Sequence, residues 1–184
     1  MEINNQKNLD RWKFGPQQVV YSAIGASLYM VLQVAASFLH IPALQNVSIR
    51  PAAVIPMFFG VAFGPWVGLL SGLAGSLFGD LMSQQGFWPW WCLGNGLMGF
   101  LPGLIWRDLR TYRDIRDILK VEGMLVVGAG VGMGLASLSE MWVSQLKFTE
   151  TVTINFLPMF LSNTVTGLVL VPVLLLVFHQ ACEK

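Results

Sequence analysis

Apolar positions along the chain gather into six runs separated by short polar or Gly/Pro-rich breaks. Most runs are roughly as long as the helix of about 20 residues that crosses a hydrocarbon core about 30 Å thick. The pattern therefore predicts a bundle of membrane-crossing helices. The runs cover approximately residues 17–38, 49–63, 66–83, 90–106, 121–143 and 154–178.

The second run is short and contains Pro51 and Pro56. A helix of about 15 residues reaches only about 22 Å, so a re-entrant hairpin is the alternative to a full span. Basic residues gather on the cytoplasmic side of membrane proteins. Six spans leave only Arg50 and Lys147 outside, whereas five would turn the basic cluster at 107–120 outward. The positive charges therefore favour six transmembrane helices with both termini in the cytoplasm.

The predicted fold class is an all-α integral membrane protein with one helical domain. Residues 1–16 are predicted to form a cytoplasmic N-terminal segment, residues 17–179 a single six-helix transmembrane domain, and residues 180–184 a cytoplasmic tail. Since the first 16 residues are polar, the first apolar run is interpreted as a retained span rather than a signal peptide.

Composition supports a membrane location. The chain of 184 residues is 54% hydrophobic and 11% charged, against about 25% charged residues in soluble domains. Its net charge of +1 gives no reason to expect nucleic acid as a partner. The two cysteines and two histidines show no metal-ligand spacing, so no metal or other cofactor is predicted.

The loop RDLRTYRDIRDILK, residues 107–120, carries charges of both signs at helical spacing. One interpretation is a short amphipathic helix on the inner membrane surface. The other is a solvated loop whose basic residues only set the topology.

Small residues recur at intervals of four, as in Gly64, Gly68 and Gly72 and again in Gly75 and Gly79. Such spacing lets helices approach closely in lipid, where association depends on packing rather than on the hydrophobic effect. Internal helix packing is the simplest interpretation of these glycines.

The first helix carries two further pairs of small residues, Ser22 with Ala26 and Ala23 with Ser27. Both pairs lie in the predicted cytoplasmic third of that helix. A groove for a partner protein and simple internal packing are both compatible with this position.

Polar side chains within the spans are costly and are therefore candidates for function. On the six-span topology all of them lie on the extracellular side of the membrane midplane, which favours a cup open to the outside over a continuous channel. These residues are Gln33, Asp80, Asn95, Glu140, Asn155 and Asn163.

Aromatic residues cluster at the same level, namely Phe87, Trp88, Trp90, Trp91 and Trp142. They are typical of an interfacial belt. Alternatively they form a stacking wall for a flat ligand that the neighbouring polar side chains orient.

Catalytic patterns are weak. The two histidines are predicted at opposite ends of the membrane, and no serine is paired with a histidine at similar depth. Asp80 and Glu140 remain an acid and base pair for a small intramembrane enzyme, as an alternative. No glycine loop of the phosphate-binding type is present, so no ATP hydrolysis is predicted.

The segment RPAAVIPMFFGVAFGPWVGLLSGLAGSLFGDL, followed by GFWPWWCLGNGLMGFLPGL, resembles the substrate-binding S components of energy-coupling factor (ECF) transporters, which import vitamins in prokaryotes. The resemblance covers residues 17–178 and implies a multi-pass protein of the prokaryotic cell membrane without enzymatic activity. It implies as partners a transmembrane coupling protein and two ABC ATPases. Such proteins dock through Ala-x-x-x-Ala on the first helix, for which Ala23–Ser27 and Ser22–Ala26 are approximate matches.

The leading prediction is an S component that captures a vitamin-like solute from outside, with a ring such as that of a thiamine precursor, a flavin or a pterin. The alternative is a structural membrane protein that organises an envelope complex and has no small-molecule ligand. The predicted binding residues are Asp80, Trp90, Trp91, Asn95, Glu140, Asn155 and Asn163.

Overall fold

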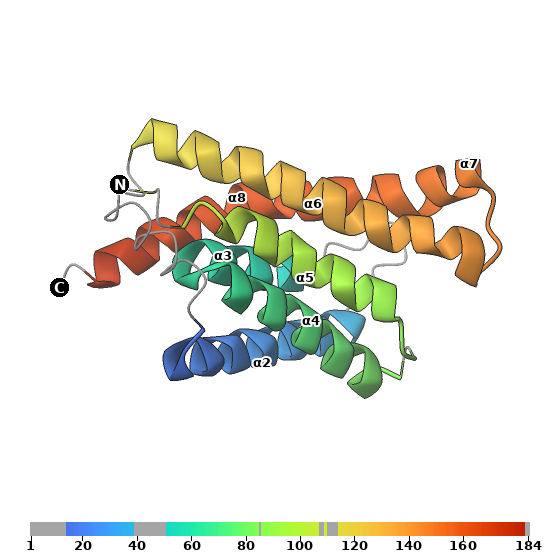
Figure 1. Ribbon diagram of the computed structural model, residues 1–184, viewed down its shortest axis with the longest axis horizontal. Helices are drawn as coiled ribbons and strands as arrows, with labels where there is room; N and C mark the ends of the chain where they lie inside the picture. Colours follow the sequence, from blue (N-terminus) through green and yellow to red (C-terminus); the bar gives the residue numbers. More distant parts are fainter. Residues whose placement is uncertain (1–13, 39–50, 85, 107–108, 110–113, 183–184) are drawn as a thin grey trace, which may run out of the picture.

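The computed structural model describes residues 14–38, 51–84, 86–106, 109 and 114–182. The predicted N-terminal segment up to residue 13 and the link at residues 40–48 lie outside this part of the chain. Each predicted apolar run is helical in the structure (Figure 1). The elements are α2 (Pro16–Phe38), the 3-10 turn η1 (Pro51–Ala53), α3 (Val54–Phe63), α4 (Pro65–Met82), α5 (Pro89–Gly103), α6 (Ile115–Val143), α7 (Phe148–Glu150), the π-helical turn η2 (Thr151–Phe156) and α8 (Leu157–Cys182).

Three stretches of the described chain are helical, long and apolar enough to cross a membrane: Pro16–Ser37, Ile115–Val143 and Phe148–Ala181. Pro51–Phe63 is a shorter apolar helix. The prediction of an all-α fold is therefore confirmed for the described residues, and three of its helices have the length and composition of membrane spans.

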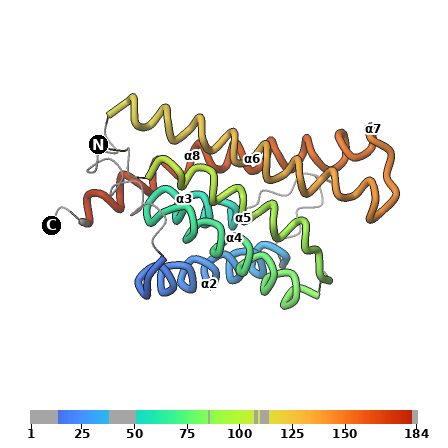
Figure 2. Tube along the Cα trace, viewed as in Figure 1, coloured from blue at the N-terminus to red at the C-terminus, as the bar shows by residue number. Residues whose placement is uncertain are grey.

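The helices run side by side and form three layers (Figures 1 and 2). Helices α2 and α4 form one outer layer, α3 and α5 the middle layer, and α6 and α8 the other outer layer, with contacts between adjacent layers. Helix α2 begins and α8 ends at one end of the bundle, whereas the α4–α5 and α6–α7 connections lie at the opposite end.

The core lies where the middle layer meets α6 and α8. Met57 and Val61 of α3 pack with Met98 of α5 and with Leu125 and Met133 of α6, and all five side chains are fully buried. The outer faces of α2 and α8 are instead lined with exposed aliphatic residues. In a bilayer such faces contact lipid, where exposed apolar side chains carry no hydration cost.

The α4–α5–α6 contacts are made by backbone. A Cβ atom on Gly99 would lie 2.6 Å from the carbonyl oxygen of Gly68, and one on Gly94 would lie 2.5 Å from that of Gly132. Carbon atoms do not approach oxygen so closely, so these positions exclude any side chain. The predicted role of glycine in internal packing is confirmed at these contacts.

The Gly64–Pro65 break turns the chain from α3 into α4, as predicted. Gly64 has a φ angle of 114°, a conformation that residues with a Cβ rarely adopt. Its amide donates to the carbonyl oxygen of Gly60 at 2.9 Å and closes α3. Pro65 then occupies the first turn of α4, where its missing N–H has no helical partner to lose.

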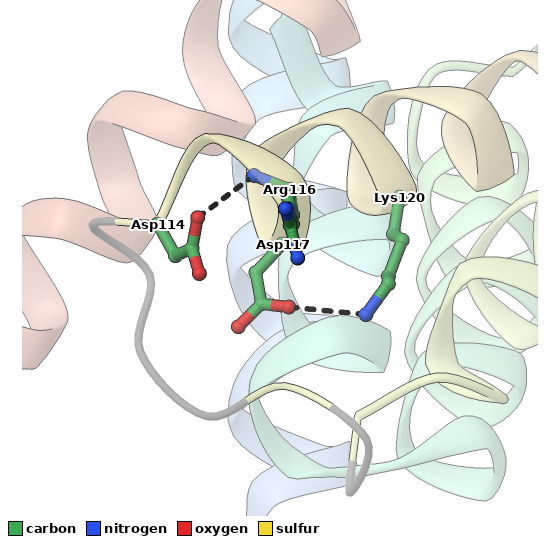
Figure 3. Close-up of polar contacts among 4 residues, drawn as sticks. All are labelled: Asp114, Arg116, Asp117 and Lys120. Carbon is green, nitrogen blue, oxygen red and sulfur yellow. Dashed lines mark hydrogen bonds and ion pairs between the residues drawn. The ribbon is translucent and has the colours of Figure 1, made fainter.

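Helix α6 begins at Ile115, six residues earlier than the predicted start at Val121. The carboxylate of Asp114 caps the helix, since its Oδ1 accepts from the Arg116 amide at 3.1 Å (Figure 3). One turn on, Lys120 Nζ lies 3.3 Å from Asp117 Oδ1. Both interpretations of residues 107–120, a solvated loop and a separate surface helix, are wrong for the described residues from Ile115 onward, which are the first turns of α6.

Candidate ligand-binding site

A cavity of about 230 Å³ lies at the end of the bundle where α4 and α6 end and where α5 and η2 begin. These four elements supply all of its described walls except Trp88, which directly precedes α5, and Met159, which lies in the first turn of α8. The lining residues are Ser76, Asp80, Trp88, Trp91, Asn95, Glu140, Asn155 and Met159.

Five of the seven predicted binding residues line this cavity, and Trp90 and Asn163 do not. Trp90 lies beside the cavity on an exposed surface, where its ring meets Trp142 edge to face at 6.4 Å between centroids. Asn163 is buried in α8 at 1% exposure, and its Oδ1 has no hydrogen-bond partner among the described residues.

Three lining residues are absent from the predicted set. Ser76 lies one helical turn before Asp80, and Met159 lies one turn after Asn155. The i, i+4 spacing of a helix places each beside a predicted residue. Trp88 belongs to the aromatic cluster at the start of α5, which pointed to this region without separating Trp88 from Trp90.

One wall joins α4 to α5. Asn95 Nδ2 donates to Ser76 Oγ at 2.9 Å, and Cys92 Sγ donates to Asp80 Oδ2 at 3.8 Å. Gln33 of α2 supports the wall from behind, with Nε2 donating to Asp80 Oδ1 at 2.6 Å. Gly79 makes room for Gln33, since a Cβ there would lie 2.8 Å from its Cδ.

The opposite wall centres on Glu140, near the end of α6. Its Oε1 accepts from Trp91 Nε1 at 2.7 Å, and its Oε2 accepts from the hydroxyl of Ser144. Glu140 is 8% exposed. These two donors fix the carboxylate and the indole ring in one orientation, because neither side chain can rotate without losing a bond.

The remaining wall comes from η2 and α8. A π-helical turn is wider than an α-helical one; such turns are rare and are frequently found at functional sites. Here it spans Thr151–Phe156, immediately before α8. It carries Asn155 into the cavity wall, with Met159 one turn later.

Five of the eight lining side chains are polar, and two indole rings and one methionine complete the wall, so the cavity offers both hydrogen bonds and a stacking surface to a small molecule. No group of three or more His, Cys, Asp and Glu side chains in the described part of the chain is placed to hold a metal ion. The arrangement suits recognition by hydrogen bonds and stacking.

The predicted docking residues lie on two faces of α2. Ser22 and Ala26 are buried, and the Ala26 carbonyl oxygen lies 2.9 Å from where a Cβ on Gly75 would be. Ala23 and Ser27 are exposed, with Ser27 Oγ donating to the Ala23 carbonyl oxygen at 2.8 Å. Only the second pair lies on an accessible surface of the described chain.

A helical bundle with apolar outer faces and a small polar and aromatic cavity has the features of a membrane protein that binds a small molecule. Among known protein families, the one described as ECF-type riboflavin transporter, S component, matches this chain over residues 13–180. The chain therefore belongs to the family of ECF-type riboflavin transporter S components. The resemblance predicted from the sequence is confirmed.

Curated relatives carry the family name UPF0397. A UPF0397 protein of Aliivibrio salmonicida is 38% identical over 139 residues, which cover 72% of this chain and 74% of the relative. One from Vibrio atlanticus is 37% identical over 91 residues, or 50% of this chain and 49% of the relative. One from Streptococcus pneumoniae is 33% identical over 106 residues, or 57% and 56%. The matches thus span only about half the length of the latter two relatives, and no solved structure matches the chain.

Proposed function

We propose that this S component captures a vitamin-like, ring-containing solute from the extracellular side of a prokaryotic cell membrane. It then delivers the solute through a complex with a transmembrane coupling protein and two ABC ATPases. The observation that carries the proposal is the cavity of about 230 Å³, where indole rings and fixed polar side chains from separate helices meet at one end of the bundle. The bacterial relatives support the prokaryotic location.

The proposed orientation puts the cavity outside and both termini in the cytoplasm. The charged start of α6, with Asp114, Arg116 and Lys120, lies at the end of the bundle opposite the cavity. Basic residues at that end agree with the cytoplasmic side. In this orientation all six apolar helices contribute to crossing the membrane, with α3 paired to α4 through the turn at Gly64.

Riboflavin is the first ligand to test, because the matching family profile is named for it. Thiamine precursors and pterins are further candidates, since each carries a flat ring that can stack on indole. Trp88 and Trp91 offer such surfaces in the cavity wall.

Docking to the coupling protein is proposed through the exposed pair Ala23 and Ser27. Because the Ser27 hydroxyl bonds within its own helix, the pair presents a small surface with no unsatisfied donor. Such a surface lets a partner helix approach closely in lipid.

The decisive experiment is mass spectrometry of small molecules that co-purify with the detergent-solubilised protein, followed by thermal-shift titration. Uptake of the identified compound is then measured in cells that co-express the coupling protein and the two ATPases. The matched control carries ATPases inactivated at the phosphate-binding lysine. We expect a bound ring compound and ATPase-dependent uptake. A protein that carries no compound, responds to no vitamin and purifies with partners other than an ATPase module would instead support a structural role.

A further inference from the structure

The side chains that line the cavity indicate most directly what charge its ligand carries. We propose that the ligand presents a positively charged or N–H-rich nitrogen group to Glu140, and that phosphorylated forms of the same compound are rejected. The ligand class is a small amino-substituted nitrogen heterocycle. This inference rests on the proposed function, because it describes the solute that the same cavity captures.

Glu140 acts as an acceptor at both of its oxygens. The indole N–H of Trp91 is a donor only, and it points at Oε1. The Ser144 hydroxyl donates to Oε2. Both oxygens of the Glu140 side chain are therefore held by donors that come from the protein.

The carboxylate has no cation beside it in the described part of the chain. Its side-chain contacts there are Trp91 and Ser144, and no described Lys, Arg or His lines the cavity. A buried charge that is not paired is costly even when hydrogen-bonded. A cationic group on the ligand offsets that cost, and it makes a charge-assisted hydrogen bond of the stronger kind.

The other walls also favour a donor. Asn95 gives one of the two N–H groups of its amide nitrogen to Ser76, and its Oδ1 is an acceptor that a donor on the ligand can use. Asp80 adds a second carboxylate to the cavity, on the α4–α5 wall that also carries Asn95. The indole faces of Trp88 and Trp91 attract cations through their negative π-surface.

Size narrows the class further. The cavity of about 230 Å³ lies below the range of about 300–1,000 Å³ typical of sites for drug-sized ligands. One or two rings therefore suit it better than the three fused rings and sugar-like chain of a flavin. A phosphate group would bring negative charge to the carboxylates of Asp80 and Glu140, which repel it.

The test uses four probes and isothermal titration of the full-length protein. Thiamine supplies a cation and an amino group, and oxythiamine has the same skeleton without the amino group. Thiamine monophosphate adds negative charge, and riboflavin is a neutral three-ring compound. The variants are E140Q, which keeps the shape but removes the charge, E140D, which keeps the charge, and the control E122Q, a partly buried glutamate of α6 outside the cavity.

We expect thiamine to bind the wild type more tightly than oxythiamine or thiamine monophosphate, by about tenfold in each case. E140Q should lose about tenfold in thiamine affinity, E140D should lose less, and E122Q should equal the wild type. Size-exclusion profiles check that each variant is folded.

Three results would overturn the inference: equal thiamine affinity in E140Q and wild type, tighter binding of the phosphorylated probe, or no binding of thiamine. If riboflavin binds the wild type and thiamine does not, the charge inference fails while the proposed S-component function stands. Failure of the uptake experiment above would remove the proposed function itself.

Discussion

The indole Nε1 of Trp91 donates a 2.7 Å hydrogen bond to Glu140 Oε1, although 49 residues separate the two in the chain. The bond joins α5 to α6 at the cavity. It holds a flat aromatic face and a carboxylate together before any ligand arrives. Pre-positioned groups lose little entropy when a ligand binds, so this pair is expected to contribute strongly to affinity.

Replacing Trp91 with Phe tests this pair. The ring remains but the donor is lost, so Glu140 keeps only Ser144 and its orientation is no longer fixed. We expect about a tenfold loss of affinity for the co-purified ligand, or about 1.4 kcal/mol, measured by isothermal titration. Trp90→Phe is the matched control, because Trp90 packs on Trp142 outside the cavity and should bind as the wild type does. Equal losses in both variants would remove the special role of Trp91.

Asn95→Ala should abolish measurable ligand binding while the protein stays folded. The substitution deletes the polar group of the α4–α5 wall and leaves Ser76 without its donor. Asp80→Ala should have the same effect, because it removes the carboxylate that Gln33 supports. Titration gives the affinity and size-exclusion chromatography the folded state. Unchanged affinity in both variants would contradict the assignment of the cavity as the binding site.

Gly99→Ala should lower the free energy of unfolding by about 1–3 kcal/mol, the usual cost of overpacking. Its new Cβ would lie 2.6 Å from the Gly68 carbonyl oxygen and 2.7 Å from that of Pro56, and backbone cannot move aside cheaply. Gly123→Ala is the control, since nothing lies within 4 Å of its position, and it should raise stability by about 0.5–1 kcal/mol. Thermal unfolding in detergent measures both. A Gly99 variant as stable as the control would show that backbone contact does not hold α4 to α5.

Ala23→Trp should reduce recovery of the coupling protein in affinity purification by about tenfold, while ligand affinity stays unchanged. The large side chain would stand on the exposed face where close helix approach is proposed. Val165→Trp on the exposed face of α8 is the control for added bulk and should assemble normally. Normal assembly of the Ala23 variant would place the docking surface elsewhere.

The helices follow from the sequence because twenty-residue apolar runs have few alternatives in a bilayer. The start of α6 does not, since Ile115–Lys120 is a charged stretch whose helical state depends on the Asp114 cap and on continuity with the apolar helix behind it. A prediction from hydropathy alone therefore leaves Ile115–Lys120 out of the helix. The turn at Gly64 was predictable, because Gly followed by Pro offers both the unusual φ angle and a helix start.

The cavity was predicted in its polar members and less well in its geometry. The predicted depth of each residue along its helix placed Asp80, Asn95 and Glu140 at one level of the membrane. It did not show which neighbouring side chains face them. Trp90 and Trp91 differ by one helical step of about 100°, and only the packing of α5 shows that Trp91 is the inner one. Asn163 was grouped with Asn155 by α-helical spacing, whereas Asn155 lies in a π-helical turn, which holds more residues per turn than an α-helix.

The stacked rings of Phe156 and Phe160 have a consequence for how this scaffold diversifies. A Cβ atom on Gly134 or Gly130 of α6 would lie at ordinary contact distances from these rings, 3.8 Å from Phe156 and 3.6 Å from Phe160, whereas α4, α5 and α6 touch through their backbones. Substitutions can therefore accumulate on α8 without disturbing the glycine contacts, and Asn155 and Met159 are the cavity residues on that side. We therefore expect changes of substrate preference to arise first at Asn155 and Met159, while the backbone contacts among α4, α5 and α6 stay the same.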